Sequence, residues 1–528
     1  MAPGPPGVTP AATGEQIVRG RHVVSRVAPD GRPVIVDAGG VLVRDGVVAE
    51  VAAFDDLARR HPRAAVVGAG RDVVVPGLVN AHHHTGLTPT QHGIPDAPLE
   101  LWLPSFMGMR AVDPYLDTLH SAIEMLESGV TTVQHIQGGP IGPRGGWMST
   151  AERIVRAYED AGMRVSYCFM LRDRNRFVYG DDAAFLASLP PALAAELRGL
   201  LADRTAPLEE YVGFFEELAA RWHDPRGRVC VQLAPANLQW CTDRALELQR
   251  DAALRHGAGL HMHLLETAYQ RAFSGKHDGH SAVRHLERLG LLGPSMTIGH
   301  GIWMTADDAD LVAATGTMVC HNASSGLRLQ SGIAPVAALL DRGVKVALGI
   351  DQAGINDDRD MLQEMRVAWC LQRGPGHDAE PPSAATVFRM ATEFGAATTG
   401  FADRIGVLEP GRAADLVLLD WDAVATPYLD AETPVLDALL HRAKASAVRT
   451  SMVGGRVVLR DGRPVGVDAD AVRGEIARQL AGGPTAAEQR RRELARSLAP
   501  HVRDFYRGWP VPTATRGYPR FNDPEDRP

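Results

Sequence analysis

The sequence is poor in cysteine, and no stretch of it is long and apolar enough to cross a membrane. Its five cysteines are scattered and form no Cys-x-x-Cys pair, which fits a reducing compartment rather than a disulfide scaffold. A bilayer span needs an apolar run of roughly 18 residues, and none reaches that length. The first residues, MAPGPPGVTPAATGEQ, lack the basic start and apolar core of a secretory signal. We therefore expect a cytoplasmic protein with no membrane partner.

An excess of positive charge is also missing. Asp and Glu total 63 against 55 for Lys and Arg, so the net charge of −8 argues against a nucleic-acid partner. Several motifs are absent: HExxH, GxxxxGK[ST], GxSxG and HxE followed by PCxxC. Their absence excludes zincin peptidases, P-loop nucleotide hydrolases, nucleophile-elbow hydrolases and cytidine-deaminase-type enzymes.

The two ends of the chain share a β-type pattern. Residues 1–14 are rich in Pro, Gly, Ala and Thr, and predict a disordered tail. Short apolar runs broken by turns fill residues 15–75, and the same rhythm returns over residues 402–465. Both segments carry an Arg-Asp-Gly turn between apolar runs, which is typical of a hairpin. We expect one small composite β-sandwich domain built from both flanks of a central domain.

The centre of the chain, residues 76–401, alternates apolar runs such as TTVQHI, VCVQLAP and VKVALGID with helical stretches. This alternation predicts an α/β protein with a parallel sheet, either open or closed into a barrel. A polar, helical insertion interrupts the alternation at about residues 172–228. Residues 466–528 predict a helical extension and tail, in which the charge run AAEQRRRELARSL is interpreted as a solvated helix face.

Three histidines end the strand-like run VVVPGLVNAHHHTG. Side chains alternate between the two faces of a strand, so His82 and His84 point one way and His83 points the other. Two imidazoles at the carboxyl end of a strand make half of a metal site. The alternative interpretation is a pair of ordinary polar loop residues.

The apolar runs that follow end in the same kind of residue. LHMHLLET contains His261 and His263, with Glu266 three residues on, and MTIGHG ends at His300. TMVCHN ends at His321 and VKVALGID at Asp351. The carboxyl ends of parallel barrel strands open onto one face, where active sites lie. These residues are therefore predicted to converge at one site. Ordinary core histidines would not be expected at the end of every one of these runs.

In this order, PGLVNAHHH, HLLET, GHG, HN and ALGID resemble the amidohydrolase superfamily. The stretch from HNASSGLRLQSG to DMLQEMR is similar to the branch of chlorotriazine hydrolases and of cytosine, guanine and S-adenosylhomocysteine deaminases. The resemblance covers residues 15–465. It implies a distorted (β/α)8 TIM barrel with a metal at its mouth, a small β-domain, and assembly as a homo-oligomer, a dimer or larger.

Carried over residue by residue, the resemblance implies four metal ligands: His82, His84, His263 and Asp351. It also places His300 beside the metal-bound water and makes Glu266 the proton-shuttling acid. We interpret His83 and His261 as structural residues. His321 and Asn322 would orient the site.

Lysine is scarce, and this scarcity bears on the number of metals. Binuclear members of the superfamily bridge two metals with a carboxylated lysine on the fourth strand. The three lysines are Lys276, Lys345 and Lys444, so none lies between His84 and His263. We expect one divalent metal per chain, unless a glutamate takes the bridging role. Zn²⁺ is expected and Fe²⁺ is the alternative, because histidine and carboxylate ligands do not discriminate well between them.

Together these inferences predict a hydrolase of carbon–nitrogen bonds other than peptide bonds. It would deaminate an amino-substituted nitrogen heterocycle by attack of metal-bound hydroxide, releasing ammonia. Asp351 would accept the water proton, His300 would orient the hydroxide, and Glu266 would protonate the ring nitrogen. One alternative is hydrolysis of a chloro- or alkylamino-heterocycle, or of a cyclic amide or imine. Another is a barrel that binds a ligand without turnover.

Candidate contacts to the small-molecule substrate are Trp102, Asn237, Gln239, Trp303, Arg328 and Gln352. Ala236 and Asn237 stand where many deaminases of the branch have a substrate-contacting histidine, which weakens the case for S-adenosylhomocysteine-type deamination. Gln352 stands where glycine commonly follows the aspartate. Trp102 either walls the pocket or packs its loop. Arg328 meets a substrate carboxylate or phosphate, or pairs with a structural acid.

Overall fold

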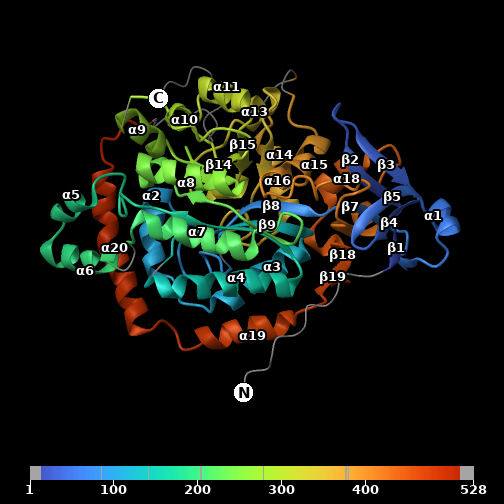
Figure 1. Cartoon of the computed structure of the whole chain (residues 1–528), viewed down its shortest axis with the longest axis horizontal. Coiled ribbons are helices and arrows are strands. Elements are labelled where there is room, and N and C mark those ends of the chain that lie inside the picture. The colour runs from blue at the N-terminus through green and yellow to red at the C-terminus, as the bar shows by residue number, and fades with distance from the viewer. Residues whose placement is uncertain are drawn as a thin grey trace.

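A computed structural model describes residues 14–511, with gaps at 85, 141, 203–204, 278, 375–376 and 378–379. The predicted tail, apart from Gly14, lies outside the described residues. Figure 1 shows parallel strands surrounded by helices in the centre, and a separate group of strands to one side. None of the described helices is both long enough and apolar enough to pass through a membrane.

The central strands form two parallel four-stranded sheets, ordered β11-β10-β9-β8, with β12 also pairing with β10, and β13-β14-β15-β16. Isolated bridges join the edges of the two sheets, between His83 and Asp351 and between Leu233 and Leu260. Because all the strands run parallel, their carboxyl ends lie at the same end of the sheets. The strands are β8 (Leu78–His83), β9 (Val130–Gln137), β10 (Arg164–Leu171), β11 (Val229–Val231), β12 (Ala234–Pro235), β13 (Leu260–Leu264), β14 (Met296–His300), β15 (Met318–His321) and β16 (Val346–Leu348).

Helices connect these strands and begin and end at the expected signals. Asp113 caps α3 and Thr242 caps α8 through side-chain bonds to backbone N–H groups. Gly162, Gly257 and Gly316 end α4, α8 and α11 in the left-handed conformation that glycine adopts most easily. The helices are α2 (Leu99–Trp102), η1 (Leu103–Gly108), α3 (Pro114–Glu127), η2 (Arg144–Gly146), α4 (Trp147–Ala161), η3 (Leu238–Trp240), α8 (Asp243–His256), α9 (Ala268–His277), α10 (Ala282–Arg288), α11 (Ala306–Thr315), α12 (Ala323–Arg328), α13 (Val336–Asp341), α14 (Met361–Leu371), α15 (Ala384–Met390) and α16 (Glu393–Ala397).

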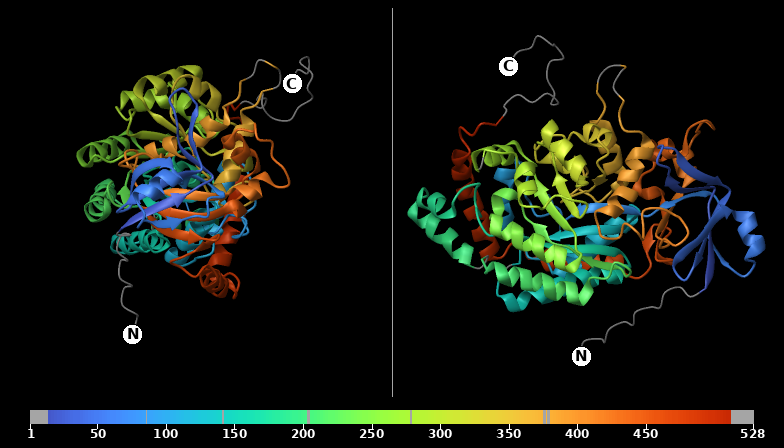
Figure 2. Two further views of the ribbon diagram at one scale, coloured as in Figure 1. Left: turned by 90° about the vertical axis from the view of Figure 1, so that its right-hand side faces the viewer. Right: turned by 45° about the horizontal axis from the view of Figure 1, so that its top comes forward.

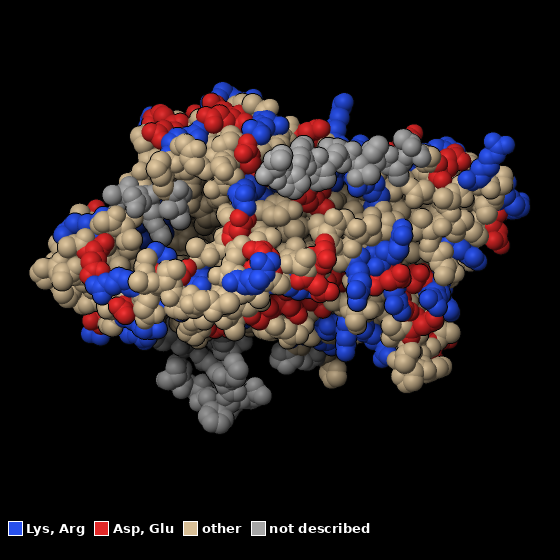
Figure 3. Space-filling model, turned by 90° about the horizontal axis from the view of Figure 1, so that it is seen from below, with Lys and Arg blue, Asp and Glu red and all other residues tan. Residues whose placement is uncertain are grey.

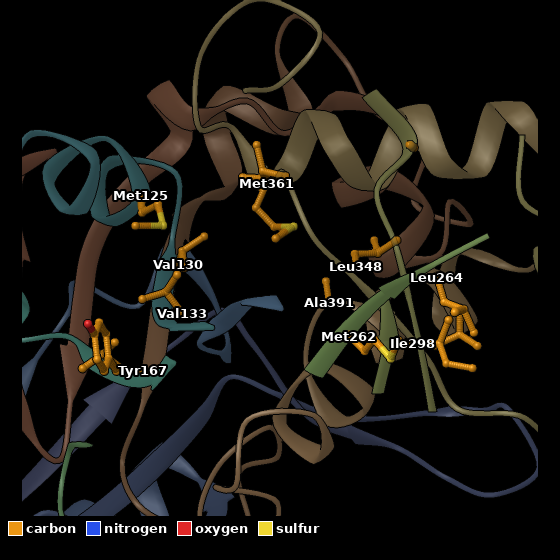
Figure 4. Close-up of a cluster of buried hydrophobic side chains, with 14 of the residues drawn as sticks. Met125, Val130, Val133, Tyr167, Met262, Leu264, Ile298, Leu348, Met361 and Ala391 are labelled. Carbon is orange, nitrogen blue, oxygen red and sulfur yellow. The ribbon is translucent and has the colours of Figure 1, made fainter. Parts of the chain in front are cut away.

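The core lies between the helices and the strands. Figure 4 shows Met125 of α3 and Met361 of α14 among the same buried side chains as Tyr167, Met262 and Ile298 of the strands. Burying a side chain of this size stabilises the fold by about 1.5–3 kcal/mol. One continuous apolar cluster therefore holds both parallel sheets and fixes the positions of their ends.

The β-rich segments at the two ends of the chain lie together. β7 pairs with β17, which is more than 300 residues away in the sequence, in a seven-stranded sheet ordered β20-β19-β18-β17-β7-β2-β3. A four-stranded sheet, β5-β4-β1-β6, shares an apolar cluster with it through Val18, Val41, Val74 and Leu416. The elements are β1 (Glu15–Arg19), β2 (His22–Val27), β3 (Pro33–Asp37), β4 (Gly39–Arg44), β5 (Val47–Ala53), α1 (Phe54–Arg60), β6 (Ala65–Val67), β7 (Asp72–Pro76), β17 (Leu416–Asp420), α17 (Trp421–Ala425), α18 (Val435–Arg442), η4 (Ala445–Ala447), β18 (Val448–Val453), β19 (Arg456–Arg460) and β20 (Arg463–Pro464).

Helices fill the segment predicted as an insertion and the carboxyl-terminal extension. Residues 172–228 contain α5 (Asp182–Ala187), α6 (Pro191–Ala202) and α7 (Leu208–Trp222). After β20 come α19 (Ala469–Leu480) and α20 (Ala486–Phe505). α20 runs beside α2 and packs on η1 (Figures 1 and 2).

The interpretation of the α20 charge run as a solvated face is wrong for one side of this helix. Arg491 and Arg492 donate to the carbonyls of Met107 and Gly108 at 3.1 and 3.0 Å. The buried Glu488 carboxylate accepts the Ala111 N–H at 2.9 Å. These charged groups dock the helix, because they satisfy backbone groups of the segment that follows β8.

Acidic and basic side chains are interspersed over the face of the molecule shown in Figure 3. No continuous basic stripe crosses the described part of that face.

Candidate metal centre

Four predicted ligands meet at the carboxyl ends of β8, β13 and β16. Nε2 of His84 lies 3.2 Å from Nε2 of both His82 and His263, and 3.1 Å from Oδ1 of Asp351. Oδ1 of Asp351 lies 3.7 Å from Nε2 of His82. Ligand atoms of His82, His84 and His263 lie close enough together to hold one ion, as do those of His82, His300 and Asp351.

Hydrogen bonds behind the histidines settle which ring nitrogen faces the centre. Nδ1 of His84 donates to the Ile136 carbonyl at 2.8 Å. Nε2 of the same ring therefore carries the free lone pair that can bind a metal. Nδ1 of His82 is paired with Nε2 of His261 at 2.9 Å, so its Nε2 faces His84. His261 thus lies behind a candidate ligand and fixes its ring, an arrangement common at metal sites.

The electrostatics of this cluster favour a cation. Burial, and then the neighbouring imidazoles, lower the pKa of His82 and His263 well below the usual value, so both rings are neutral. Nε2 of His82 and Nε2 of His263 each lie 3.2 Å from Nε2 of His84, a spacing at which one divalent cation can bind imidazole nitrogens. The donor set of imidazole nitrogens and one carboxylate therefore fits such an ion.

Asp351 is held from both sides. Burial would raise its pKa, but bonds and charges from His84, followed by the His300 charge and the Ser325 hydroxyl, hold the pKa below the usual range. Oγ of Ser325 donates to Oδ2 of Asp351 at 2.6 Å. Asp351 and His300 have left-handed backbones, with φ of 61° and 73°. Such conformations in residues other than glycine cluster at functional sites.

Glu266 supplies a buried carboxyl group next to the cluster. Its Oε2 lies 3.8 Å from Nε2 of His300, which is itself 3.8 Å from Oδ2 of Asp351. Burial, and then the Asp351 and Glu100 carboxylates, raise the pKa of Glu266 well above its usual value. A carboxyl group that stays protonated near neutral pH can donate a proton to a substrate.

The remaining histidines lie around this group. His83 points away from it, and its Nε2 lies 3.2 Å from the Ser121 hydroxyl of α3. His321 is buried with both ring nitrogens unpaired among the described residues. The Asn322 amide lies 3.3 Å from Nδ1 of His300.

Two candidate substrate contacts, Arg328 and Trp303, make hydrogen bonds to protein groups. Arg328 donates to Asp96 and Asp357 at 3.0 Å and so links the segments after β8, β15 and β16. This is the pairing with structural acids that the sequence left open. Nε1 of Trp303 donates to the Ser331 carbonyl at 2.8 Å.

The other candidates are buried. Trp102 packs in a small apolar cluster with Ile94, Leu99 and Leu329, and its Nε1 is unpaired among the described residues. Gln239 is also buried with its Nε2 unpaired, and Gln352 is 7% exposed.

The sequence analysis missed two residues that contact the site. Ser325 binds Asp351, and Oε1 of Gln270 accepts the Glu266 N–H at 2.8 Å. Gln270 stands three residues after Thr267 at the start of α9, a spacing at which a glutamine side chain reaches back to the backbone N–H groups that precede the helix. This spacing could have indicated Gln270 from the sequence. No such indication exists for Ser325, because its contact with Asp351 joins segments that come together only in the folded protein.

Parallel strands, crossover helices and a histidine and carboxylate cluster at the strand ends define a hydrolase-type metal centre in an α/β protein. The chain matches the Amidohydrolase family over residues 73–458. It therefore belongs to the amidohydrolase family.

Curated relatives and solved structures cover most of the chain. It is 32% identical over 456 residues to 5-methylthioadenosine/S-adenosylhomocysteine deaminase of Syntrophobacter fumaroxidans, covering 85% of this chain and 94% of that one. It is 30% identical over 440 residues to 5′-deoxyadenosine deaminase of Methanothermobacter thermautotrophicus, covering 81% and 92%. A zinc-bound adenosine deaminase structure from Xanthomonas campestris has a TM-score of 0.73 at 27% identity, covering 88% and 98%. Atrazine chlorohydrolase of Arthrobacter aurescens, at 22% identity and a TM-score of 0.74, covering 88% and 99%, shows the same fold.

Proposed function

We propose that this protein hydrolytically deaminates an amino-substituted nitrogen heterocycle, with the adenine ring of a nucleoside derivative as the first candidate. Water replaces the exocyclic amino group, so one water is consumed and one ammonia is released. The observation that carries the proposal is the buried Glu266 carboxyl, which lies 3.8 Å from Nε2 of His300 beside the ligand cluster and has a raised pKa. The named activities of the deaminase relatives support the same class of substrate.

One divalent cation per chain would be held by His82, His84, His263 and Asp351, with zinc first and ferrous iron as the alternative. The neutral Nε2 atoms and the single carboxylate support this choice. When bound, such an ion lowers the pKa of a coordinated water to roughly 7 and makes hydroxide available at neutral pH.

The chain's own residues would move the protons. Glu266 gives its proton to the ring nitrogen next to the attacked carbon, which makes that carbon more electrophilic. Asp351, held by Ser325, takes one proton of the attacking water and passes it to the amino nitrogen, which leaves as ammonia. The second proton of that water restores Glu266 when the new carbonyl forms. His300 lies between these two carboxyl groups and orients the water through Nε2.

We also propose the domain organisation, cellular location and assembly that the sequence predicts. The two parallel sheets would form one closed (β/α)8 barrel over residues 76–401, and the bridges at both sheet edges support this. Residues 15–75 and 402–465 would form the β-sandwich domain, and 466–528 the extension. We propose a cytoplasmic homo-oligomer without a nucleic-acid or membrane partner.

Ammonia release tests the function. Zinc-loaded protein is incubated with adenosine, 5′-deoxyadenosine, 5′-methylthioadenosine, S-adenosylhomocysteine, guanine, cytosine, and amino-pterins and amino-triazines. The proposal predicts ammonia from at least one substrate, and loss of that activity in Asp351→Asn. Silence across the panel with metal bound, or release of chloride or an alkylamine instead, would overturn deamination.

A further inference from the structure

An amide pair lies beside Glu266, and the proposed reaction does not use it. Oε1 of Gln270 accepts two hydrogen bonds, from the Glu266 N–H at 2.8 Å and from Nδ2 of Asn237 at 3.1 Å. Asn237 is fixed in turn, because its Oδ1 accepts the Leu238 N–H at 2.8 Å. Asn237 is 1% exposed and Gln270 2%, so water does not compete for these bonds.

The other end of the Gln270 amide lies close to two groups, the Glu266 carboxyl and the Tyr179 hydroxyl, and lowers the pKa of both. The Gln270 Nε2 is buried and makes no hydrogen bond to a described residue. A buried donor without an acceptor is destabilising and calls for an explanation. The effect of the amide on the pKa of Glu266 acts against the larger effect of burial.

We propose that Gln270 is a positioning residue for Glu266. Its Oε1 fixes the Glu266 backbone, with Asn237 holding the amide in that orientation. Its Nε2 is the donor available to the Glu266 carboxylate once the proton has gone to the substrate. This role rests on the proposed function of Glu266 as the proton donor.

The chemistry of the step explains why a donor is left unpaired. After proton transfer, Glu266 becomes a buried carboxylate close to Asp351, and a buried charge needs a hydrogen-bond donor. A neutral amide suits both states, because it adds no charge while Glu266 is protonated. Asn237 acts on Glu266 only through Gln270. The amide nitrogen of Asn237 donates to Gln270 and its amide oxygen accepts the Leu238 N–H.

Two variants separate the two ends of the amide. Gln270→Leu removes both, whereas Gln270→Glu keeps an oxygen for the two N–H donors and removes the Nε2 donor. The matched control is Gln249→Leu, a buried glutamine of α8 whose Nε2 donates to the Ala245 carbonyl. Zinc content and the melting temperature are measured for every variant, so that a folding defect is detected.

With 5′-methylthioadenosine as the probe, we expect kcat to fall about 10- to 100-fold in both Gln270 variants. KM should stay within about twofold, because the interaction strengthens only after proton transfer. Unchanged kcat in both Gln270 variants, or an equal fall in Gln249→Leu, would overturn the role.

Amide hydrogen exchange tests the positioning without turnover. The Glu266 N–H should exchange faster in Gln270→Leu and at the wild-type rate in Gln270→Glu and Gln249→Leu. Unchanged exchange in Gln270→Leu would overturn the backbone contact. If no substrate of the panel releases ammonia from the wild type, the deamination proposal fails separately, and the exchange measurement still decides the contact.

Discussion

At the scale of single residues, the site depends on the protonation states that burial imposes. Burial lowers the pKa of His82 and His263, which favours the neutral rings that can bind a cation, and raises the pKa of Glu266, which favours its protonated form. Asp351 is the exception, because hydrogen bonds and charges keep it ionised despite its burial. Neutral ligands, one carboxylate and one acid therefore coexist within a few ångströms.

Replacing Glu266 by glutamine removes the transferable proton and keeps the shape. We expect Glu266→Gln to lower kcat by about 10²–10⁴-fold, the range that general acid catalysis contributes. Metal content should not change, because Glu266 lies outside the proposed ligand set. Ammonia assays and elemental analysis of the same preparation check this, and wild-type kcat in the variant would contradict the role.

A second buried acid, Glu364, should make the free energy of unfolding depend on pH. Its carboxylate accepts the Ser324 N–H at 3.0 Å and the Ser324 hydroxyl, and so holds the helix that carries Ser325. Burial raises the pKa of Glu364 from 4.5 to about 7. The folded state therefore binds this proton more tightly than the unfolded state does.

The sign follows from proton binding. The contribution of Glu364 is complete below pH 4.5 and is lost as the pH rises through 7. Relative to Glu364→Gln, the wild type should lose up to about 3 kcal/mol of unfolding free energy between pH 4.5 and 8. Denaturant titrations at several pH values check this, and a difference that does not change with pH would contradict it.

At the scale of elements, the carboxyl ends of the strands bring the site together, and the segments after them are tied to one another. Arg328 bonds to Asp96, to Asp357 and to the Gly354 carbonyl, so one guanidinium links three segments at the site end of the strands. Of the candidate substrate contacts, Trp102, Arg328 and Gln352 lie on these segments.

Arg328→Ala distinguishes the two roles that the sequence allowed. If the residue ties the segments, the variant should lose about 1–3 kcal/mol of stability, and all substrates should be affected alike. Urea unfolding and KM for charged and neutral substrates are compared. Wild-type stability with a KM raised for anionic substrates alone would assign Arg328 to substrate binding instead.

The order of elements and the ligand cluster were predictable because their signals are local. Apolar runs ending in His or Asp mark strand ends, and side-chain alternation separates His83 from His82 and His84. The partners of these residues were not predictable. Ser325 meets Asp351, and Arg328 meets Asp96 across 232 positions, only after the fold has formed.

At the scale of the whole molecule, the two ends of the chain enclose the central part. β7 and β17 unite the terminal β-segments, and α20 returns to the segment that follows β8. The bonds of Arg491 and Arg492 to backbone carbonyls could not be predicted from a charge run, which reads equally well as an exposed helix face.

Removing these two docking arginines tests whether the extension stabilises the rest. We expect the double variant Arg491→Ala/Arg492→Ala to lower the melting temperature and to speed proteolysis within residues 103–111. The control is Arg490→Ala, because Arg490 is largely exposed and pairs with Glu196 at the surface. Equal effects in the control and the double variant would contradict the docking role.

The central claim is that water replaces an amino group at this site. The most direct measurement is turnover of 5′-methylthioadenosine by zinc-loaded protein in oxygen-18-labelled water, with mass spectrometry of the product and quantification of ammonia. The account predicts one labelled oxygen in place of the amino nitrogen, ammonia equal to product, and neither in Asp351→Asn. A product that keeps its amino group, or no product from any substrate of the panel while the metal is bound, would contradict it.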